Sequence, residues 1–176
     1  MKRTLVKGTD PPKTQELRKL ATIDSIHKAC KEGKIDKLPK KLLTEEFFLL
    51  QTYETTPLHV AAEYGHLDQV PKPLLTKKNL FVQDGYGNSV LQIAARTHQL
   101  NRLPRELLTA KNLQIKDTDG DTAFHVASID QIPKELLTEA NLLIANKNRK
   151  TVLHCIAANG ELTKVPREET SLQGLI

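Results

Sequence analysis

A seven-residue motif occurs four times, with variations, in this chain of 176 residues. This repetition constrains the fold more than any other feature of the sequence. The heptapeptide TPLHVAA, from Thr56 to Ala62, returns in altered form from Ser89, Thr122 and Thr151, at spacings of 33, 33 and 29 residues. A unit of this length cannot bury its own apolar face, so consecutive units must stack on one another. The sequence therefore predicts an elongated array of units.

A second recurring segment follows each heptapeptide. VPKPLLT, from Val70 to Thr76, returns as LPRELLT and IPKELLT, and a fainter copy of the whole pattern precedes it at residues 24–44. Its proline recurs as Pro39, Pro104, Pro133 and Pro166. We therefore expect a segment 1–22, which forms a basic arm or a capping helix, and a repeat domain 23–176. Its five units are 23–52, 53–83, 84–116, 117–145 and the incomplete 146–176.

The heptapeptide has the features of a helix start. Thr56 is a good N-cap, and Pro57 then occupies the first helical position, where its missing N–H costs nothing. Ala61 and Ala62 are small enough to let a neighbouring helix approach closely. Gly65 follows as a residue that can end the helix with a positive φ.

A second helix should begin close to Pro71, because proline is tolerated in a first turn while the residue before it avoids helical geometry. We expect this helix to be short, with Leu74 and Leu75 buried. The segments QDGYGN and KDTDGD that follow in two units are typical of turns at hairpin tips.

Residues 23–167 resemble the ankyrin repeat family, whose signature Thr-Pro-Leu-His-x-Ala and 33-residue period they share. The resemblance implies an all-α solenoid with two antiparallel helices per repeat and a β-hairpin-like turn between repeats. It also implies that the histidines at one repeat position are structural and hydrogen-bond to backbone between repeats. These are His27, His59, His125 and His154.

The unit at 117–145 lacks four residues that its neighbours have, the counterparts of 63–66. Four residues are about one helical turn, so the first helix should be shorter while its buried face stays in phase. We expect this unit to be the weakest joint of the stack. The deletion should also bring Asp130 close to the end of that helix, where a negative charge is unfavourable.

Composition and charge narrow the class of protein. No apolar run approaches the roughly 20 residues of a membrane span, and the N-terminal segment lacks the apolar core of a secretory signal. Two distant cysteines suggest a reducing compartment. We therefore expect no membrane association and a cytoplasmic location, or secretion as an effector into a host cytosol. Residues 1–40 carry a surplus of six positive charges, which fits either a solvated cap or an arm for acidic partners.

The residues provide no convergent chemistry. We assign no catalytic residue, no cofactor-binding residue and no metal ligand, because the repeat-position histidines should lie too far apart to share an ion. The acidic stretch from Asp117 to Asp121 resembles part of a calcium loop but lacks the distal glutamate, so we interpret it as a turn.

What remains is surface. By the resemblance, partners bind to the hairpin tips and the exposed side of the first helices, and all three tyrosines of the chain fall at such positions. The expected partner-binding residues are Tyr53, Tyr64, Tyr86, Asn88, Arg96, Thr97, Asp119, Lys147 and Lys150.

We expect a non-enzymatic, monomeric module that binds a protein or peptide through the tips and the concave face. Two alternatives stay open. One is binding of nucleic acid or an acidic surface through the basic N-terminal end. The other is a scaffold domain of a larger assembly or a bacterial effector.

Overall fold

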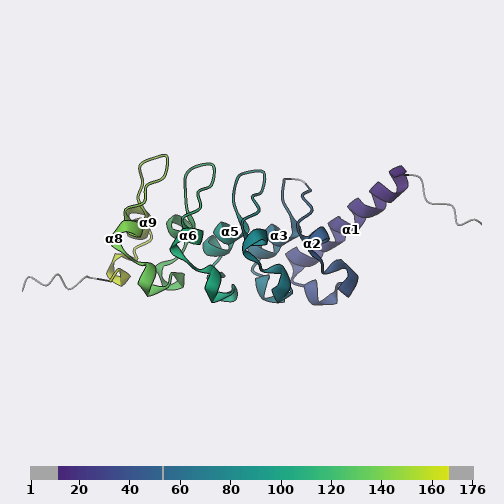
Figure 1. Cartoon of the computed structure of the whole chain (residues 1–176), viewed down its shortest axis with the longest axis horizontal. Coiled ribbons are helices and arrows are strands. Elements are labelled where there is room, and N and C mark those ends of the chain that lie inside the picture. The colour runs from purple at the N-terminus through teal and green to yellow at the C-terminus, as the bar shows by residue number, and fades with distance from the viewer. Residues whose placement is uncertain (1–11, 53, 167–176) are drawn as a thin grey trace, which may run out of the picture.

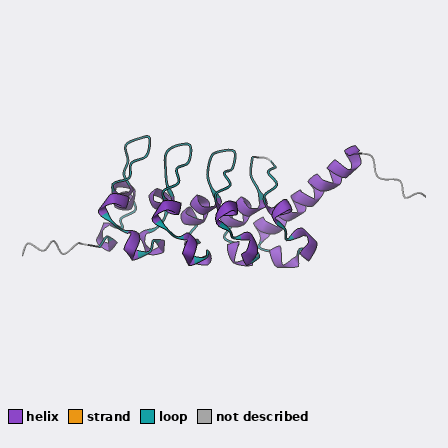
Figure 2. Ribbon diagram, viewed as in Figure 1, coloured by secondary structure: helices purple, strands orange, loops and turns teal. Residues whose placement is uncertain are grey.

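The computed structural model of the chain describes residues 12–52 and 54–166, with side chains from residue 19 onward. This part is built from α-helices, short 3-10 turns and loops, and it contains no β-strand (Figure 2). The helices form an elongated row from which hairpin loops project on one side (Figure 1). The expected all-α solenoid is therefore confirmed.

The first helix of each unit begins where the heptapeptide predicts it. α3 (Pro57–Glu63) starts after Thr56, whose hydroxyl oxygen accepts a hydrogen bond from the His59 N–H at 3.4 Å. Gly65, with φ +86°, follows the end of this helix, as expected. The equivalent helices are α5 (Val90–Arg96), α7 (Ala123–Val126) and α9 (Val152–Ala158).

The second helix differs from the prediction, because it is broken into separate pieces. The 3-10 turn η4 (Lys72–Leu74) follows Pro71, and the chain then extends at Thr76, which caps a new four-residue helix, α4 (Lys77–Leu80). Thr76 is β-branched, which lowers its preference for a helix interior, and its hydroxyl can cap a helix start. Both properties favour a break here over a continuous helix. The counterparts of α4 are α2 (Glu45–Phe48), α6 (Ala110–Leu113) and α8 (Glu139–Leu142).

Nine 3-10 turns complete the described part of the chain. One turn lies before each repeat proline and, in the first four units, another lies directly after it. Those before the proline are η1 (Ile35–Lys37), η3 (Leu67–Gln69), η5 (Leu100–Arg102), η7 (Ile129–Gln131) and η9 (Leu162–Lys164). Those after it are η2 (Lys40–Leu42), η4, η6 (Arg105–Leu107) and η8 (Lys134–Leu136).

A buried asparagine holds the two pieces of the second helix together. Asn79, which is 2% exposed, donates its side-chain amide to the carbonyl oxygen of Leu74 at 2.9 Å. Asn112 and Asn141 make the same bond in the next two units, to Leu107 and Leu136, both at 2.8 Å. This bond was not among the sequence predictions, although the recurring Thr-x-x-Asn pattern indicates it.

The N-terminal helix α1 (Pro12–Glu32) is 21 residues long and extends beyond the stack (Figure 1). It runs unbroken through the boundary that the sequence analysis placed between residues 22 and 23. No glycine or proline interrupts residues 13–32, so nothing in the sequence ends the helix there. The arm or cap, over its described residues, is therefore continuous with the first repeat helix.

One apolar core runs through the whole stack, from Ile26 to Ile156. The first helices pack in sequence, α1 on α3, α3 on α5, α5 on α7 and α7 on α9. Ala61, Ala62 and their counterparts Ala94 and Ala95 are fully buried in this row. Their small side chains permit the close approach of neighbouring helices.

A polar bond joins each unit to the next. In two junctions a glutamine two residues before the proline accepts the first N–H of the preceding unit's 3-10 turn. These bonds join Gln69 Oε1 to Ile35 N at 3.1 Å and Gln131 Oε1 to Leu100 N at 3.2 Å. In the other two junctions a residue five before the proline takes this role. These bonds join Gln99 Oε1 to Leu67 N and Glu161 Oε2 to Ile129 N, both at 3.2 Å.

In the two junctions where the acceptor lies five residues before the proline, a basic residue occupies the position two residues before the proline. Arg102 stands two residues before its proline and pairs with Asp68 of the preceding unit at 2.8 Å. Lys164 pairs in the same way with Asp130 at 2.6 Å. Successive junctions therefore alternate between a glutamine acceptor and an ion pair at this position. In the sequence the alternation is visible only as Gln, Arg, Gln and Lys two residues before successive prolines.

The four-residue deletion shortens α7 to four residues, as expected. The expectation for Asp130 was wrong, however. This residue lies in the first turn of η7, where a negative charge is favourable, and Lys164 neutralises it. The weaker hold of the units after Ile132 stays a prediction, and faster amide exchange in residues 139–165 than in 58–108 would support it.

Candidate protein-binding surface

The hairpin tips of successive units are joined by hydrogen bonds. The Gly85 N–H donates to the Glu54 carbonyl at 2.6 Å, and the Thr118 hydroxyl donates to the Tyr86 carbonyl at 2.8 Å. At the next junction the Lys147 N–H donates to the Asp119 carbonyl at 3.0 Å. The row of loops in Figure 1 is thus a connected surface with a fixed geometry.

Close contact between tips explains the glycines there. A Cβ atom at Gly87 would lie 2.5 Å from Thr118 Cγ2, and a Cβ atom at Gly120 would lie 3.0 Å from the Lys147 nitrogen. Both glycines also have φ +79°, which other residues adopt at a cost. Arg149, at the corresponding position of the last hairpin, adopts φ 62°.

Each five-residue tip is closed by the side chain of its first residue. Asp84 Oδ1 accepts hydrogen bonds from the backbone N–H groups of Tyr86 at 2.9 Å and Asn88 at 2.8 Å. Asp117 and Asn146 bond in the same way within the following two tips. These side-chain turns are the reason for the recurring Asp or Asn, and they hold the tip backbones in place.

His59 ties the first helix to the hairpin that follows. Its Nδ1 lies 2.7 Å from the Thr56 hydroxyl, and its Nε2 lies 3.0 Å from the Val82 carbonyl and 3.2 Å from that of Asn88. Two carbonyl acceptors require the proton on Nε2, so Nδ1 accepts from the threonine. Burial lowers the pKa of His59, which favours this neutral form.

The same connection occurs elsewhere in the stack. Gln92 replaces the histidine in the next unit, and its Nε2 donates to the carbonyls of Asp121 at 2.8 Å and Ile115 at 3.3 Å. In the unit after that, His125 Nε2 lies 3.3 Å from the Lys150 carbonyl.

The two outer histidines differ. His27 Nδ1 lies 3.4 Å from the Thr52 hydroxyl, while its buried Nε2 has no hydrogen-bond partner in the described part of the chain. Burial lowers the pKa of His27 as well. His154 is exposed and bonds to Thr151.

Two of the predicted tyrosines are exposed at the surface. Tyr86 stands at a hairpin tip with 68% of its surface exposed, and Tyr64, at the end of α3, is 44% exposed. The ammonium of Lys31 lies 5.2 Å from the centroid of the Tyr64 ring. Arg96 is exposed at the end of α5. Tyr53 lies outside the described residues.

Some of the other predicted residues have side chains engaged within the protein. The Thr97 hydroxyl donates to the carbonyl of Ala62 in the preceding unit at 2.8 Å, and Lys147 Nζ donates to the Thr118 carbonyl at 2.6 Å. Asn88 is half-buried, with its amide 3.4 Å from both Asp84 carboxylate oxygens. Asp119 and Lys150 are exposed.

The described part of the chain contains no group of three or more His, Cys, Asp or Glu residues that could hold a metal ion. Burial raises the pKa of the Cys30 thiol to about 12, so it stays protonated at neutral pH. None of the described helices is long and apolar enough to cross a membrane.

The stacked helix pairs and connected hairpins define the class as an α-helical repeat solenoid. Residues 26–104 match the family model of ankyrin repeats in three copies. These residues are therefore ankyrin repeats. Ankyrin repeats are generally protein–protein interaction modules. No curated protein matches the chain in sequence.

Proposed function

We propose that the chain is a non-enzymatic module that binds a partner protein or peptide through its hairpin tips and the concave face. The binding surface comprises Tyr86 and Asp119 at the tips, Lys150 at the last hairpin, and Tyr64 and Arg96 at the ends of first helices. The five side chains are exposed in neighbouring units.

The exposure of Tyr86 on a fixed backbone is the observation that supports this proposal most strongly. A large aromatic side chain that is 68% exposed does not stabilise the fold by burial. Its backbone is nevertheless fixed on both sides, by the Asp84 carboxylate at its N–H and by the Thr118 hydroxyl at its carbonyl. A rigidly presented aromatic residue loses little entropy on binding, which is the property of an interface anchor.

Tyr64 and Arg96 extend the surface onto the first helices. Tyr64 ends α3 and Arg96 ends α5, the helix of the next unit. Tyrosine and arginine are the residue types most enriched among side chains that dominate binding energy. A partner segment that crosses two units can contact both.

Affinity capture tests this proposal, with partners identified by mass spectrometry and their affinities then measured. Tyr86→Ala and Tyr64→Ala should each weaken binding by about 1 kcal/mol or more. Leu143→Ala is the matched control, since Leu143 is a large side chain, 53% exposed, at the end of α8. Unchanged thermal stability is expected for all three variants, because exposed substitutions usually stay within about 0.5 kcal/mol.

The proposal fails if captured partners bind both tyrosine variants as tightly as the unaltered protein. It also fails if Leu143→Ala weakens binding as much as the tyrosine variants do. The alternative of an acidic ligand at the N-terminal end concerns a segment whose first eleven residues lie outside the described structure. It predicts a steep loss of affinity with added salt, which the tyrosine-anchored surface does not.

A further inference from the structure

Three grooves of similar make-up lie between successive units, among the 3-10 turns that flank the repeat prolines. Their volumes are about 460, 360 and 370 Å³. Each is lined by the second leucine of one unit and the proline of the next. These pairs are Leu75 with Pro104, Leu108 with Pro133, and Leu137 with Pro166.

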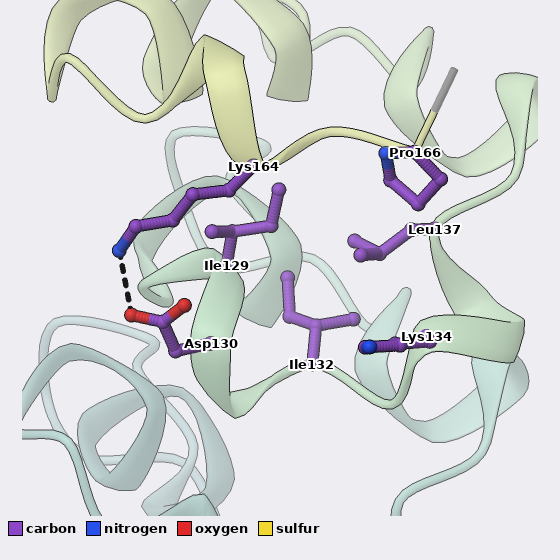
Figure 3. Close-up of a pocket in the computed structure, with 7 residues that line it drawn as sticks. All are labelled: Ile129, Asp130, Ile132, Lys134, Leu137, Lys164 and Pro166. Carbon is purple, nitrogen blue, oxygen red and sulfur yellow. Dashed lines mark hydrogen bonds and ion pairs between the residues drawn. The ribbon is translucent and has the colours of Figure 1, made fainter.

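The third groove shows the arrangement most clearly (Figure 3). Ile129, Ile132, Leu137 and Pro166 form an apolar lining, and the Lys164–Asp130 ion pair closes one side. In this groove the charged side chains thus stand at the edge of an apolar lining.

A basic residue borders every one of these grooves at the same repeat position, directly after the proline. Lys72, Arg105 and Lys134 line the three grooves in turn, and all three are exposed. The first unit carries Lys40 at this position. Each is the first residue of its 3-10 turn.

The carboxylates nearby leave part of this charge uncompensated. Asp68 and Asp130 are neutralised by Arg102 and Lys164 across the unit junctions. Glu135 lies 3.9 Å from Arg105. Glu106 lines the first groove together with Lys72.

Of the five cations that line the grooves, two have no ion pair within the described residues. These are Lys72 and Lys134, and Lys134 lines both the second and the third groove. Each groove in the row therefore contains a leucine and a proline beside a basic residue, and the last two grooves share the unpaired Lys134.

We propose that this row of grooves is a second docking surface, for an extended acidic segment of a partner protein. The segment places one apolar side chain in each groove and a carboxylate beside each basic residue. Packed helices are about 8–10 Å apart and an extended chain advances about 3.3 Å per residue, so the matching segment repeats its apolar and acidic residues about every three positions.

This surface is separate from the tip surface of the proposed function. The hairpins project from one side of the stack in Figure 1, whereas the 3-10 turns lie toward the other side. Neither Tyr64 nor Tyr86 lines any of the three grooves, so the failure of one proposal leaves the other standing.

A fluorescein-labelled peptide of four Glu-Leu-Ser triplets tests the proposal by fluorescence anisotropy. The peptide should bind the unaltered protein, whereas the same peptide with lysine in place of glutamate should not. Lys134→Glu should weaken binding about tenfold, since it replaces an attraction by a repulsion at two grooves. Lys134→Gln should have a smaller effect, and Glu106→Gln should strengthen binding.

Lys111→Glu is the matched control, because Lys111 is exposed in α6, lines none of the three grooves and changes the net charge equally. It should leave the affinity within about twofold. An equal loss in Lys111→Glu, or no binding of the glutamate peptide, would overturn the proposal. So would a 12-nucleotide single strand that competes fully at the grooves, since it would make the site a general anion surface.

Discussion

Replacing His59 by alanine should destabilise the protein far more than replacing it by glutamine. His59 is 1% exposed, and its Nε2 joins α3 to the next hairpin through the carbonyls of Val82 and Asn88, while its Nδ1 bonds to the Thr56 hydroxyl. Alanine removes both ring nitrogens and leaves a cavity, whereas glutamine restores a donor and an acceptor in one side chain.

The magnitude follows from the groups left without partners. In His59→Ala the Val82 carbonyl loses its bond to Nε2, and the Thr56 hydroxyl loses its acceptor. The Asn88 carbonyl keeps a partner, because it also accepts from the Asp84 N–H at 2.9 Å. Each unsatisfied buried polar group costs about 1–3 kcal/mol, so the two groups together with the cavity should cost at least about 2 kcal/mol.

The protein contains its own precedent for the glutamine variant. Gln92 occupies the same repeat position, where Oε1 accepts from the Ser89 N–H at 2.9 Å and its hydroxyl at 2.8 Å. Its Nε2 donates to two carbonyls around the next hairpin, as His59 does. His59→Gln should therefore cost less than about 1 kcal/mol.

Urea denaturation followed by circular dichroism measures both variants under the same conditions. A loss of similar size in the two variants would refute the reasoning, because the effect would then come from ring volume and not from hydrogen bonds. A negligible loss in His59→Ala would show that the helix-to-hairpin bond contributes nothing to the stability of the stack.

Three further predictions follow from the same structure. Burial lowers the pKa of His59 and His27 below the ordinary 6.5, so their contribution to stability is complete above pH 6.5 and is lost as the pH falls from 6.5 through the lower folded-state pKa. The urea midpoint should decline over that range, and less steeply in His59→Gln. Gln99→Ala should cost about 1–3 kcal/mol, because it leaves the Leu67 N–H without its bond. Arg102→Ala should cost less than about 1 kcal/mol, since its ion pair with an aspartate is exposed. Equal urea midpoints for the two variants would contradict this difference. Arg149→Gly should raise the thermal midpoint by relieving a positive φ of 62°, with a gain of up to about 1 kcal/mol, and a lowered midpoint would count against it.

The repeat heptapeptide was sufficient to predict the first helices. Thr56 and Gly65 act locally, one as a cap and the other as a helix end, so their roles can be read from neighbouring residues alone. The exposure of Tyr64 and Tyr86 could also be predicted from the sequence, because positions at a turn or helix end rarely face the core.

The junctions between units could not be predicted in the same way. The acceptor for the Leu67 N–H is Gln99, 32 residues away, and the equivalent acceptor in the neighbouring junctions occupies a different repeat position. Thr97 was predicted to belong to the binding surface because the resemblance places it on the exposed side of a first helix. In the structure its hydroxyl bonds to the preceding unit, a contact that depends on how two helices are stacked.

The break in the second helix could have been predicted, because the sequence contains a pattern that indicates it. The sequence predicts a helix start close to Pro71, whereas in the structure Thr76 caps a separate helix and Asn79 bonds back to Leu74. The Thr-x-x-Asn spacing, repeated in three units, was the relevant pattern.

Hydrogen exchange on the protein bound to a captured partner tests the central claim most directly, because it locates the bound surface without assuming which residues form it. If the hairpin tips bind the partner, amides of residues 84–88 and 117–121 should exchange more slowly in the complex than in the free protein. Slower exchange confined to residues 72–75 and 134–137, with the tips unchanged, would contradict the claim that this solenoid binds its partner through the hairpins.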